Sequence, residues 1–295
     1  MSSLKIDRVE VVTRPSVDEF RKKYLIQGQP VIIRDATEHL RGGPALWTLD
    51  YLAEKCGDNI VPVMKFSTSL AVPSSSEEIL FRDYIVLVRK GQTAFPRFYL
   101  KNRPVPAILP QLADEVLPPP YVEFGSISPQ MQRRSTHIYI GRAAQTTMHF
   151  HAGDESISSV IQGRKEFILF PPSETKYLSP FPLHSVGRLN QSRLEFWRNE
   201  PINHANLDRA HGYKCELGPG EMIYIPVHWW HAVYTMDEPT IMLVHFFPSS
   251  FRRWWHHPQA ARSLITRASK TILEGRARLR AAAHCRYGPG GRTQR

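Results

Sequence analysis

The chain has 295 residues, 42% of them hydrophobic and 11% aromatic, which excludes a disordered protein and predicts a packed core. Its formal charge is +11, and its three cysteines (Cys56, Cys215 and Cys285) lie too far apart for a disulfide framework or cysteine-pair zinc site. No apolar run has the length of a membrane span, and the first residues lack the apolar segment of a signal peptide. We therefore expect a soluble cytoplasmic or nuclear protein without a membrane partner.

Residues 1–134 predict an α/β extension in which helices and short strands mix. Helical spacing of apolar side chains predicts helices at Val17–Tyr24, Leu49–Lys55 and Ile79–Lys90. Apolar and β-branched runs predict strands at Pro30–Asp35, Asn59–Phe66 and Arg97–Lys101. The serine-rich stretch 74–78 predicts a loop, and the prolines of residues 102–130 predict an irregular connection that wraps around the domain.

Residues 135–250 change to short β-rich runs with Gly and Pro between them. The expected strands are Thr136–Ile140, Thr146–His151, Ile157–Gln162, Lys165–Phe170, Tyr213–Leu217, Glu221–Ile225, His231–Thr235 and Thr240–Phe247. Short strands with this punctuation are typical of a mainly β jelly roll or barrel. The long polar connection at residues 171–212 is the kind of excursion that builds a substrate surface.

Residues 251–295 carry most of the net charge. From Arg252 onward there are eleven Lys and Arg residues and a single acid, Glu274. The spacing of apolar residues at Pro258–Ala283 predicts an amphipathic basic helix, which would pack on the domain or on a second subunit as a homodimer. A basic tail suits RNA, an acidic protein or anionic lipid, and it is equally typical of a plain solvated helix.

Two histidines one residue apart, His149 and His151, lie in a predicted strand. Because side chains alternate along a strand, both imidazoles face the same side and can bind one metal ion. A third ligand has to come from elsewhere, and His231, beside a short apolar strand and a proline, is the best candidate. We expect these residues to form an open iron site.

Several linked motifs resemble the Jumonji-C family of 2-oxoglutarate oxygenases, in particular its small stand-alone hydroxylases such as the asparaginyl hydroxylase of hypoxia-inducible factor. Thr146 stands three residues before His149, and Gly163–Pro172 resembles the family's glycine and lysine strand that ends in Phe-Pro-Pro. Leu217–His231 matches the segment that leads to the distal histidine. The resemblance covers roughly residues 8–250.

The resemblance implies a double-stranded β-helix of the cupin type that uses Fe(II) and 2-oxoglutarate. It implies that His149 and His231 are metal ligands. It also implies that Lys165 pairs with the distal carboxylate of 2-oxoglutarate, with the hydroxyl groups of Thr146 and Tyr99 beside it. His245 occupies a position where the family often has a polar residue next to the cosubstrate.

His151 departs from the family, which normally has Asp or Glu there. Replacing an anion by a neutral imidazole changes both the charge and the donor set of a metal site. Three interpretations remain open: a three-histidine site, a site in which Asp154 or Glu155 reaches the metal, and a weakened site in a protein that only binds.

The expected function is hydroxylation of a protein side chain, with decarboxylation of 2-oxoglutarate to succinate. The chain contains no chromatin-reader module that would favour histone demethylation. Two alternatives remain. The substrate is RNA, which the basic tail suggests, or a small molecule. Otherwise the protein is a catalytically impaired binding protein, which the replacement of the usual acidic ligand by His151 suggests.

Overall fold

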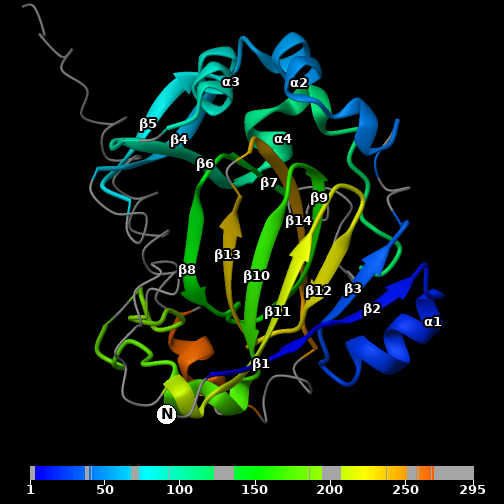
Figure 1. Cartoon of the computed structure of the whole chain (residues 1–295), viewed down its shortest axis with the longest axis vertical. Coiled ribbons are helices and arrows are strands. Elements are labelled where there is room, and N and C mark those ends of the chain that lie inside the picture. The colour runs from blue at the N-terminus through cyan, green and yellow to red at the C-terminus, as the bar shows by residue number, and fades with distance from the viewer. Residues whose placement is uncertain are drawn as a thin grey trace, which may run out of the picture.

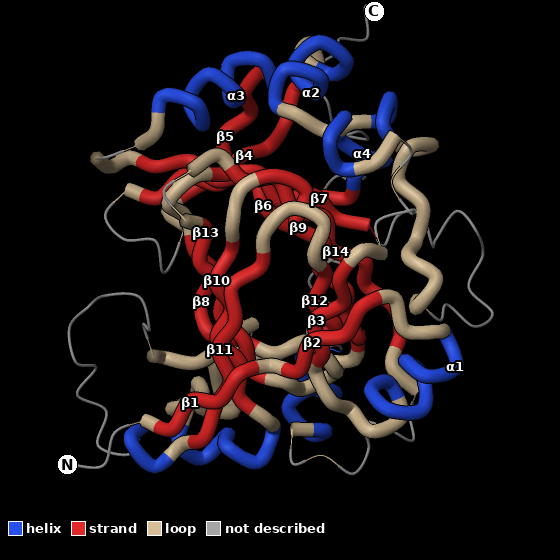
Figure 2. The backbone as a smooth tube through the Cα atoms, turned by 45° about the vertical axis from the view of Figure 1, so that its right-hand side comes forward, coloured by secondary structure: helices blue, strands red, loops and turns tan. Residues whose placement is uncertain are grey.

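The computed structural model describes residues 4–36, 40, 42–67, 73–92, 94–122, 136–185, 187–194, 207–236, 238–250, 257, 259–266 and 268. Two β-sheets face each other and enclose an apolar interior (Figure 2). This is the jelly-roll, cupin-like architecture that the sequence predicts. No helix among the described residues is long and apolar enough to cross a membrane.

The smaller sheet has five strands, with the histidine-bearing strand at one edge. Its order is β1 (Lys5–Arg8), β11 (His211–Leu217), β10 (Lys165–Phe170), β13 (Trp230–Thr235) and β8 (Gln145–His149). All neighbours pair antiparallel except β1 and β11, which are parallel.

The larger sheet has nine strands and continues into the N-terminal extension. Its order is β2 (Glu10–Thr13), β3 (Val31–Arg34), β12 (Met222–Ile225), β9 (Asp154–Gln162), β14 (Thr240–Pro248), β7 (Thr136–Gly141), β6 (Arg97–Pro104), β4 (Ile60–Phe66) and β5 (Ser75–Leu80). β6 therefore joins the extension to the jelly roll through its pairing with β7.

Helices cover the outer face of the larger sheet at the end where β4–β6 lie (Figure 1). They are α2 (Leu49–Cys56), α3 (Phe81–Lys90) and the one-turn α4 (Val105–Ile108), followed by a 3-10 turn at Pro110–Leu112. The buried Tyr84 of α3 fastens this layer to the sheet, because its hydroxyl donates to the carbonyl of Ile140 (2.5 Å) and accepts from the amide of Leu100 (2.8 Å).

A second helical element lies against β3 and β12. The helix α1 (Val17–Phe20) begins at Ser16, whose side chain accepts from the amide of Glu19, and it continues as a π-helical turn at Arg21–Leu25. Shorter 3-10 segments lie at Pro44–Leu46, Pro172–Tyr177 and Leu207–Arg209.

The eight strands predicted between residues 135 and 250 are all present, as β7–β14. The predictions for the extension need three corrections. Residues 75–80 form strand β5 instead of a loop and the start of a helix, because they pair antiparallel with β4. Residues 102–112 contain the end of β6, α4 and a 3-10 turn instead of an irregular connection. The N-terminal strands β1 and β2 are additional, and their parallel partners come from distant segments.

The start of the C-terminal segment packs on the jelly roll. Residues 260–266 are helical, and the side chains of Gln259 and Ser263 are buried. Gln259 donates to the carbonyl of Pro172 (3.1 Å), and Arg262 donates to the carbonyl of Phe181 (2.6 Å). The predicted helix at Pro258–Ala283 is therefore observed in part, and residues 269–295 lie outside the described residues. The predicted homodimer stays a prediction.

Candidate metal centre

Three histidines converge beside the edge strand β8. His149 is the last residue of β8, His151 follows two residues later, and His231 on β13 lies opposite His149 in the antiparallel register. The ligand nitrogens of the three side chains all lie within 4.8 Å of one another. In the part of the chain that the structure describes, no other histidine, cysteine or acidic side chains form a group of three. The arrangement offers three imidazole nitrogens to one ion.

Strand alternation produces this convergence. Phe150, between the two neighbouring histidines, and Trp230, just before His231, point to the opposite face, where their rings pack edge to face at 4.8 Å. Both are fully buried. Burying these two large side chains behind the sheet therefore turns the three imidazoles toward the interior.

Hydrogen bonds orient two of the rings. Nδ1 of His149 donates to the carbonyl of Thr147 (2.7 Å), and Nδ1 of His231 donates to the carbonyl of Trp229 (3.0 Å). Since Nδ1 carries the proton in each ring, Nε2 keeps its lone pair for a metal. Nδ1 of His151 is buried and has no hydrogen-bond partner among the described residues, so this ring nitrogen also fits an atom that would coordinate a metal.

The three imidazoles are neutral at physiological pH. Burial lowers the pKa of His149 to about 4 and the pKa of His151 to about 3. The pKa of His231 also lies well below its usual value, for the same reason. Neutral imidazole is the form that binds metal, so these residues fit a divalent transition metal such as Fe(II).

The two acidic alternatives lie elsewhere. The buried carboxylate of Glu155 accepts hydrogen bonds from the hydroxyl of Tyr224 (2.8 Å), the amide of Val227 (2.8 Å) and the hydroxyl of Ser249 (2.6 Å). It therefore anchors the loop before Trp230 and does not face the histidines. Asp154 is exposed at the start of β9 and is not part of the group. The geometry favours the three-histidine interpretation.

A buried lysine lies on β10, in the same interior. The side chain of Lys165 is fully buried, and its Nζ donates to the hydroxyl groups of Tyr99 (3.1 Å) and Thr235 (2.7 Å). The hairpin between β9 and β10 positions it: Gly163 has φ of +72°, and a Cβ there would meet the carbonyl oxygen of Pro239 at 2.5 Å. Burial, and then the charge of Lys101, lowers the pKa of Lys165 to about 7.

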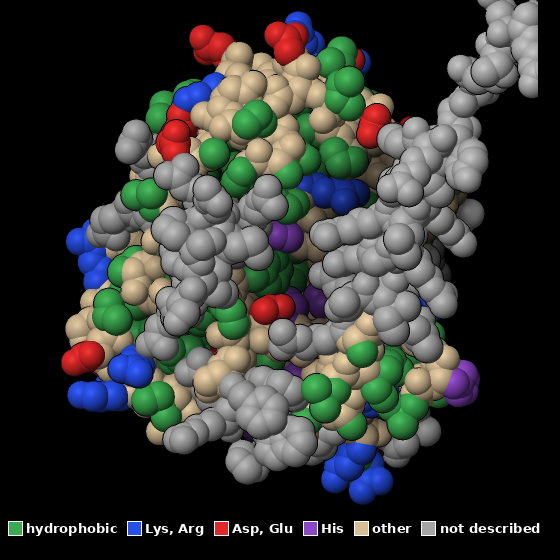
Figure 3. Space-filling model, turned by 180° about the vertical axis from the view of Figure 1, so that it is seen from behind, with side chains coloured by type: hydrophobic (Ala, Val, Ile, Leu, Met, Phe, Trp, Pro, Cys, Tyr) green, Lys and Arg blue, Asp and Glu red, His purple; other side chains and the backbone are tan. Residues whose placement is uncertain are grey.

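Thr146 completes this group from β8. Its Oγ1 accepts from the amide of Val233 (3.0 Å), its partner in the register, whose side chain belongs to the interior cluster. The hydroxyl hydrogen of Thr146 stays available to a ligand. Lys165, Tyr99 and Thr146 thus surround one interior region. Figure 3 shows histidine side chains inside a hollow of the molecule, with Lys or Arg side chains on one side of them and an Asp or Glu side chain on the other.

Comparison with known proteins agrees with this architecture. The profile of the family described as "Cupin-like domain" matches residues 17–253. The chain belongs to this family, in its Jumonji-C branch. It is 26% identical over 235 residues to "Lysine-specific demethylase JMJ30" of Arabidopsis thaliana, a match that covers 79% of this chain and 53% of that protein.

Two further relatives are similar over a comparable share of this Jumonji-C chain. "Lysine-specific demethylase 8" of Xenopus tropicalis is 24% identical over 82% of the chain and 51% of its own length. "Jumonji C domain-containing protein 5" of Drosophila melanogaster is 27% identical over 82% of the chain and 58% of its own length. The chain thus spans about half the length of these relatives.

His245 lies apart from the other predicted site residues of the Jumonji-C domain. On β14, Met242, Val244 and Phe246 belong to the interior cluster, whereas Leu243 and Phe247 pack on the outer face. By this alternation His245, which is fully buried, points to the outer face. The structure does not bring it to the cosubstrate region. Its neighbour Phe246 does reach the site, 5.0 Å from the ring of His151.

The sequence analysis missed other interior polar residues. Thr235 holds Lys165, and Ser156 is fully buried with a hydroxyl that has no partner among the described residues. Ser156 pairs with Phe246 in the register, so it faces the same interior. Lys101 lies two residues after Tyr99 on β6 and faces the same interior, since its Nζ is 6.0 Å from the centre of the Phe66 ring. Alternation from a known interior residue would have found each of them.

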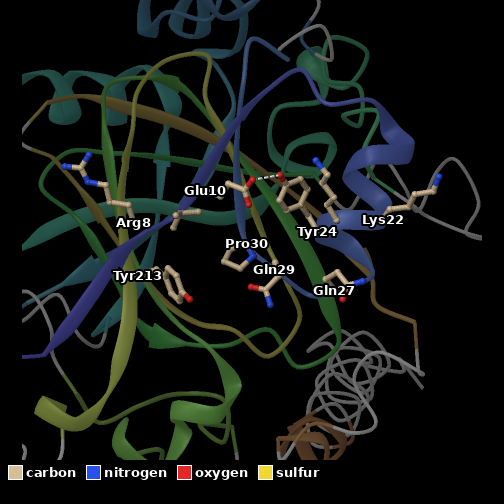
Figure 4. Close-up of a pocket in the computed structure, with 10 residues that line it drawn as sticks. Arg8, Glu10, Lys22, Tyr24, Gln27, Gln29, Pro30 and Tyr213 are labelled. Atoms are coloured by element: carbon tan, nitrogen blue, oxygen red, sulfur yellow. Dashed lines mark hydrogen bonds between the residues drawn. The ribbon is translucent and has the colours of Figure 1, made fainter.

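A separate pocket of about 530 Å³ lies at the opposite edge of the two sheets, where β1 and β2 diverge (Figure 4). The hydroxyl of Tyr24 donates there to the carboxylate of Glu10 (2.9 Å), with Arg8, Lys22 and Tyr213 around them. This pocket does not include the histidines and is not the candidate site.

Proposed function

We propose that this Jumonji-C domain is an Fe(II)- and 2-oxoglutarate-dependent oxygenase that hydroxylates a protein side chain. The observation that carries the proposal is a fully buried lysine in the same interior as three convergent neutral imidazoles. A buried ammonium group costs folding free energy unless an anion pairs with it. 2-Oxoglutarate matches this arrangement, because its distal carboxylate can pair with the ammonium group of Lys165 while its keto-acid end binds a metal held by the three histidines.

In this proposal the site residues have separate roles. His149, His151 and His231 would hold the metal through Nε2 or, for His151, through whichever ring nitrogen faces it. Lys165 and Tyr99 would bind the distal carboxylate, and the apolar walls exclude water. Iron and 2-oxoglutarate supply the oxidising power when bound. The reaction consumes dioxygen and 2-oxoglutarate, and it yields succinate, carbon dioxide and a C–OH group in place of a C–H group.

Lysine demethylation is the second candidate, because relatives of the chain are named lysine-specific demethylases. Hydroxylation of the N-methyl group of a methylated lysine gives a hydroxymethyl amine, whose C–N bond breaks to release formaldehyde and the amine. Hydroxylation at a carbon of another side chain leaves the added oxygen on the product. Formaldehyde release and product mass therefore separate the two. An RNA or small-molecule substrate remains the alternative that the basic tail suggests.

Metal content and cosubstrate turnover test the oxygenase proposal itself. After anaerobic reconstitution with Fe(II), we expect about one iron per chain and slow succinate formation from 2-oxoglutarate without added substrate. His231→Ala should lose both. His211→Ala is the matched control, since His211 on β11 pairs with Asp7 and lies outside the site. An absence of iron in the wild-type protein would instead identify a binding protein.

A further inference from the structure

A second lysine faces the interior beside the candidate metal centre. Lys101 lies on β6, on the same face as Tyr99, and its Nζ is 6.0 Å from the centre of the buried Phe66 ring. Phe66 and Tyr99 both belong to the interior cluster. The side chain of Lys101 is half-buried, so an entering ligand can reach it.

Lys101 lies close enough to both halves of the site to act on them. Its charge lowers the pKa of Lys165 on one side and the pKa of His149 on the other. Burial lowers the pKa of Lys101 itself to about 8. The amine therefore carries its positive charge through most of the neutral range.

Among the described residues Lys101 has no carboxylate or hydrogen-bond partner. Two lysines nearer the surface do have such partners: Lys65 pairs with Glu77 (2.6 Å) and Lys214 pairs with Glu166 (2.6 Å). Among the described residues no carboxylate joins the group of three histidines, and the partners of Lys165 are two hydroxyl groups. Among the described residues, the positive charges of the two interior lysines are thus not balanced by a paired carboxylate.

The proposed cosubstrate does not remove this imbalance. The two negative charges of 2-oxoglutarate offset those of Fe(II), and three neutral imidazoles add none. Lys165 and Lys101 are left with two positive charges, whereas an acidic ligand in place of His151 would have removed one. A third anionic group would offset one of these two charges.

We propose that the side chain modified by this domain is acidic, an aspartate or a glutamate, and that Lys101 binds its carboxylate. This inference rests on the proposed function. Asn102, next to Lys101, is exposed and its Oδ1 accepts from the ring of His137 (2.7 Å) and from the hydroxyl of Tyr139 (3.3 Å), so further polar groups lie where such a side chain would enter. The same positive charges oppose a methylated lysine, which keeps its charge.

Binding of short peptide pools tests the proposal without requiring turnover. The pools carry Asp, Asn or Lys at a fixed central position and neutral residues elsewhere, and fluorescence polarisation measures their affinity for the full chain loaded with Zn(II) and 2-oxoglutarate. We expect the Asp pool to bind at least about tenfold more tightly than the Lys pool, with the Asn pool between them. Raised salt should reduce the difference.

Substitutions assign the preference to Lys101. Lys101→Met and Lys101→Gln should each reduce the ratio of Asp to Lys affinity about tenfold, and Lys101→Arg should restore it. Lys65→Met is the matched control, because it removes the same charge from neighbouring strand β4 at a surface ion pair. Equal affinity for the pools, or an unchanged ratio in the folded Lys101→Met and Lys101→Gln variants, overturns the proposal. Failure of the oxygenase proposal is seen separately, as absent iron and succinate with the acidic preference intact.

Discussion

Replacing Lys165 by methionine should raise the folding stability of the metal-free protein at low pH, although the substitution removes a residue of the candidate site. Burial lowers the pKa of Lys165 from 10.5 to about 7. Each pKa unit corresponds to about 1.4 kcal/mol, so keeping the protonated amine inside costs on the order of 5 kcal/mol of folding free energy. The side chain is fully buried, and solvent therefore does not screen this cost.

The sign of the pH dependence follows from proton binding. Between pH 7 and pH 10.5 the unfolded chain binds the proton of Lys165 more tightly than the folded protein does. Wild-type stability therefore rises with pH in this window, and the cost falls from about 5 kcal/mol at pH 6 to about 1 kcal/mol at pH 10. The Lys165→Met variant lacks this pH-dependent cost, because methionine does not titrate. The substitution also removes two hydrogen bonds, each contributing about 1 kcal/mol at any pH.

Denaturant unfolding of both proteins at pH 6 and pH 10 measures the difference, in which all other titrating groups cancel. We expect Lys165→Met to be more stable than wild type by about 3 kcal/mol at pH 6, and this advantage to shrink by about 4 kcal/mol at pH 10. Tyr99→Phe keeps the amine buried and should retain the wild-type pH dependence. A difference that does not change with pH would refute the reasoning, because it would mean that the pKa of Lys165 is the same in the folded protein as in the unfolded chain.

Three further predictions concern the site and the C-terminal segment. Lys165→Met should weaken 2-oxoglutarate binding about 100-fold in calorimetry, since it removes a charged hydrogen-bond donor. His151→Ala should weaken metal binding about 100-fold in anaerobic titrations and Asp154→Ala should leave it unchanged; the reverse pattern would show that a carboxylate completes the site. Deleting residues 257–295 should destabilise the domain by about 2 to 4 kcal/mol, because Ser263 and Gln259 are buried and hydrogen-bonded, whereas deleting residues 269–295 leaves those contacts intact. Equal unfolding curves for the two deletions would contradict this prediction.

The position of the candidate ligands His149 and His151 on one face could be predicted from sequence because it depends on a local rule. Alternation places His149 and His151 on one face whatever the rest of the fold does. The motif around Gly163 and Lys165 determines a tight hairpin whose glycine is required by its positive φ. Eight strands with Gly and Pro punctuation likewise predict a jelly roll without knowledge of their pairing.

The tertiary structure alone decided which face of a strand is the interior when both faces are apolar. The run Thr240–Phe247 is buried on both sides, so its sequence shows no alternation, and His245 could be placed only through the packing of its neighbours. Glu155 is similar: only the distant Tyr224, Val227 and Ser249 reveal that its carboxylate is engaged away from the metal ligands.

Long-range pairing explains the remaining differences. The strands β1 and β5 are short and polar, and they form because segments far along the chain, or across a turn, offer free strand edges. The interior position of Lys101 was likewise not predictable from local sequence, since a lysine in a strand is ordinarily at the surface. The sequence by itself determined that three histidines and a strand lysine belong to one jelly roll. Only the folding of β6 against β7 placed a second positive charge beside them, because pairing between distant strands is not encoded in local pattern.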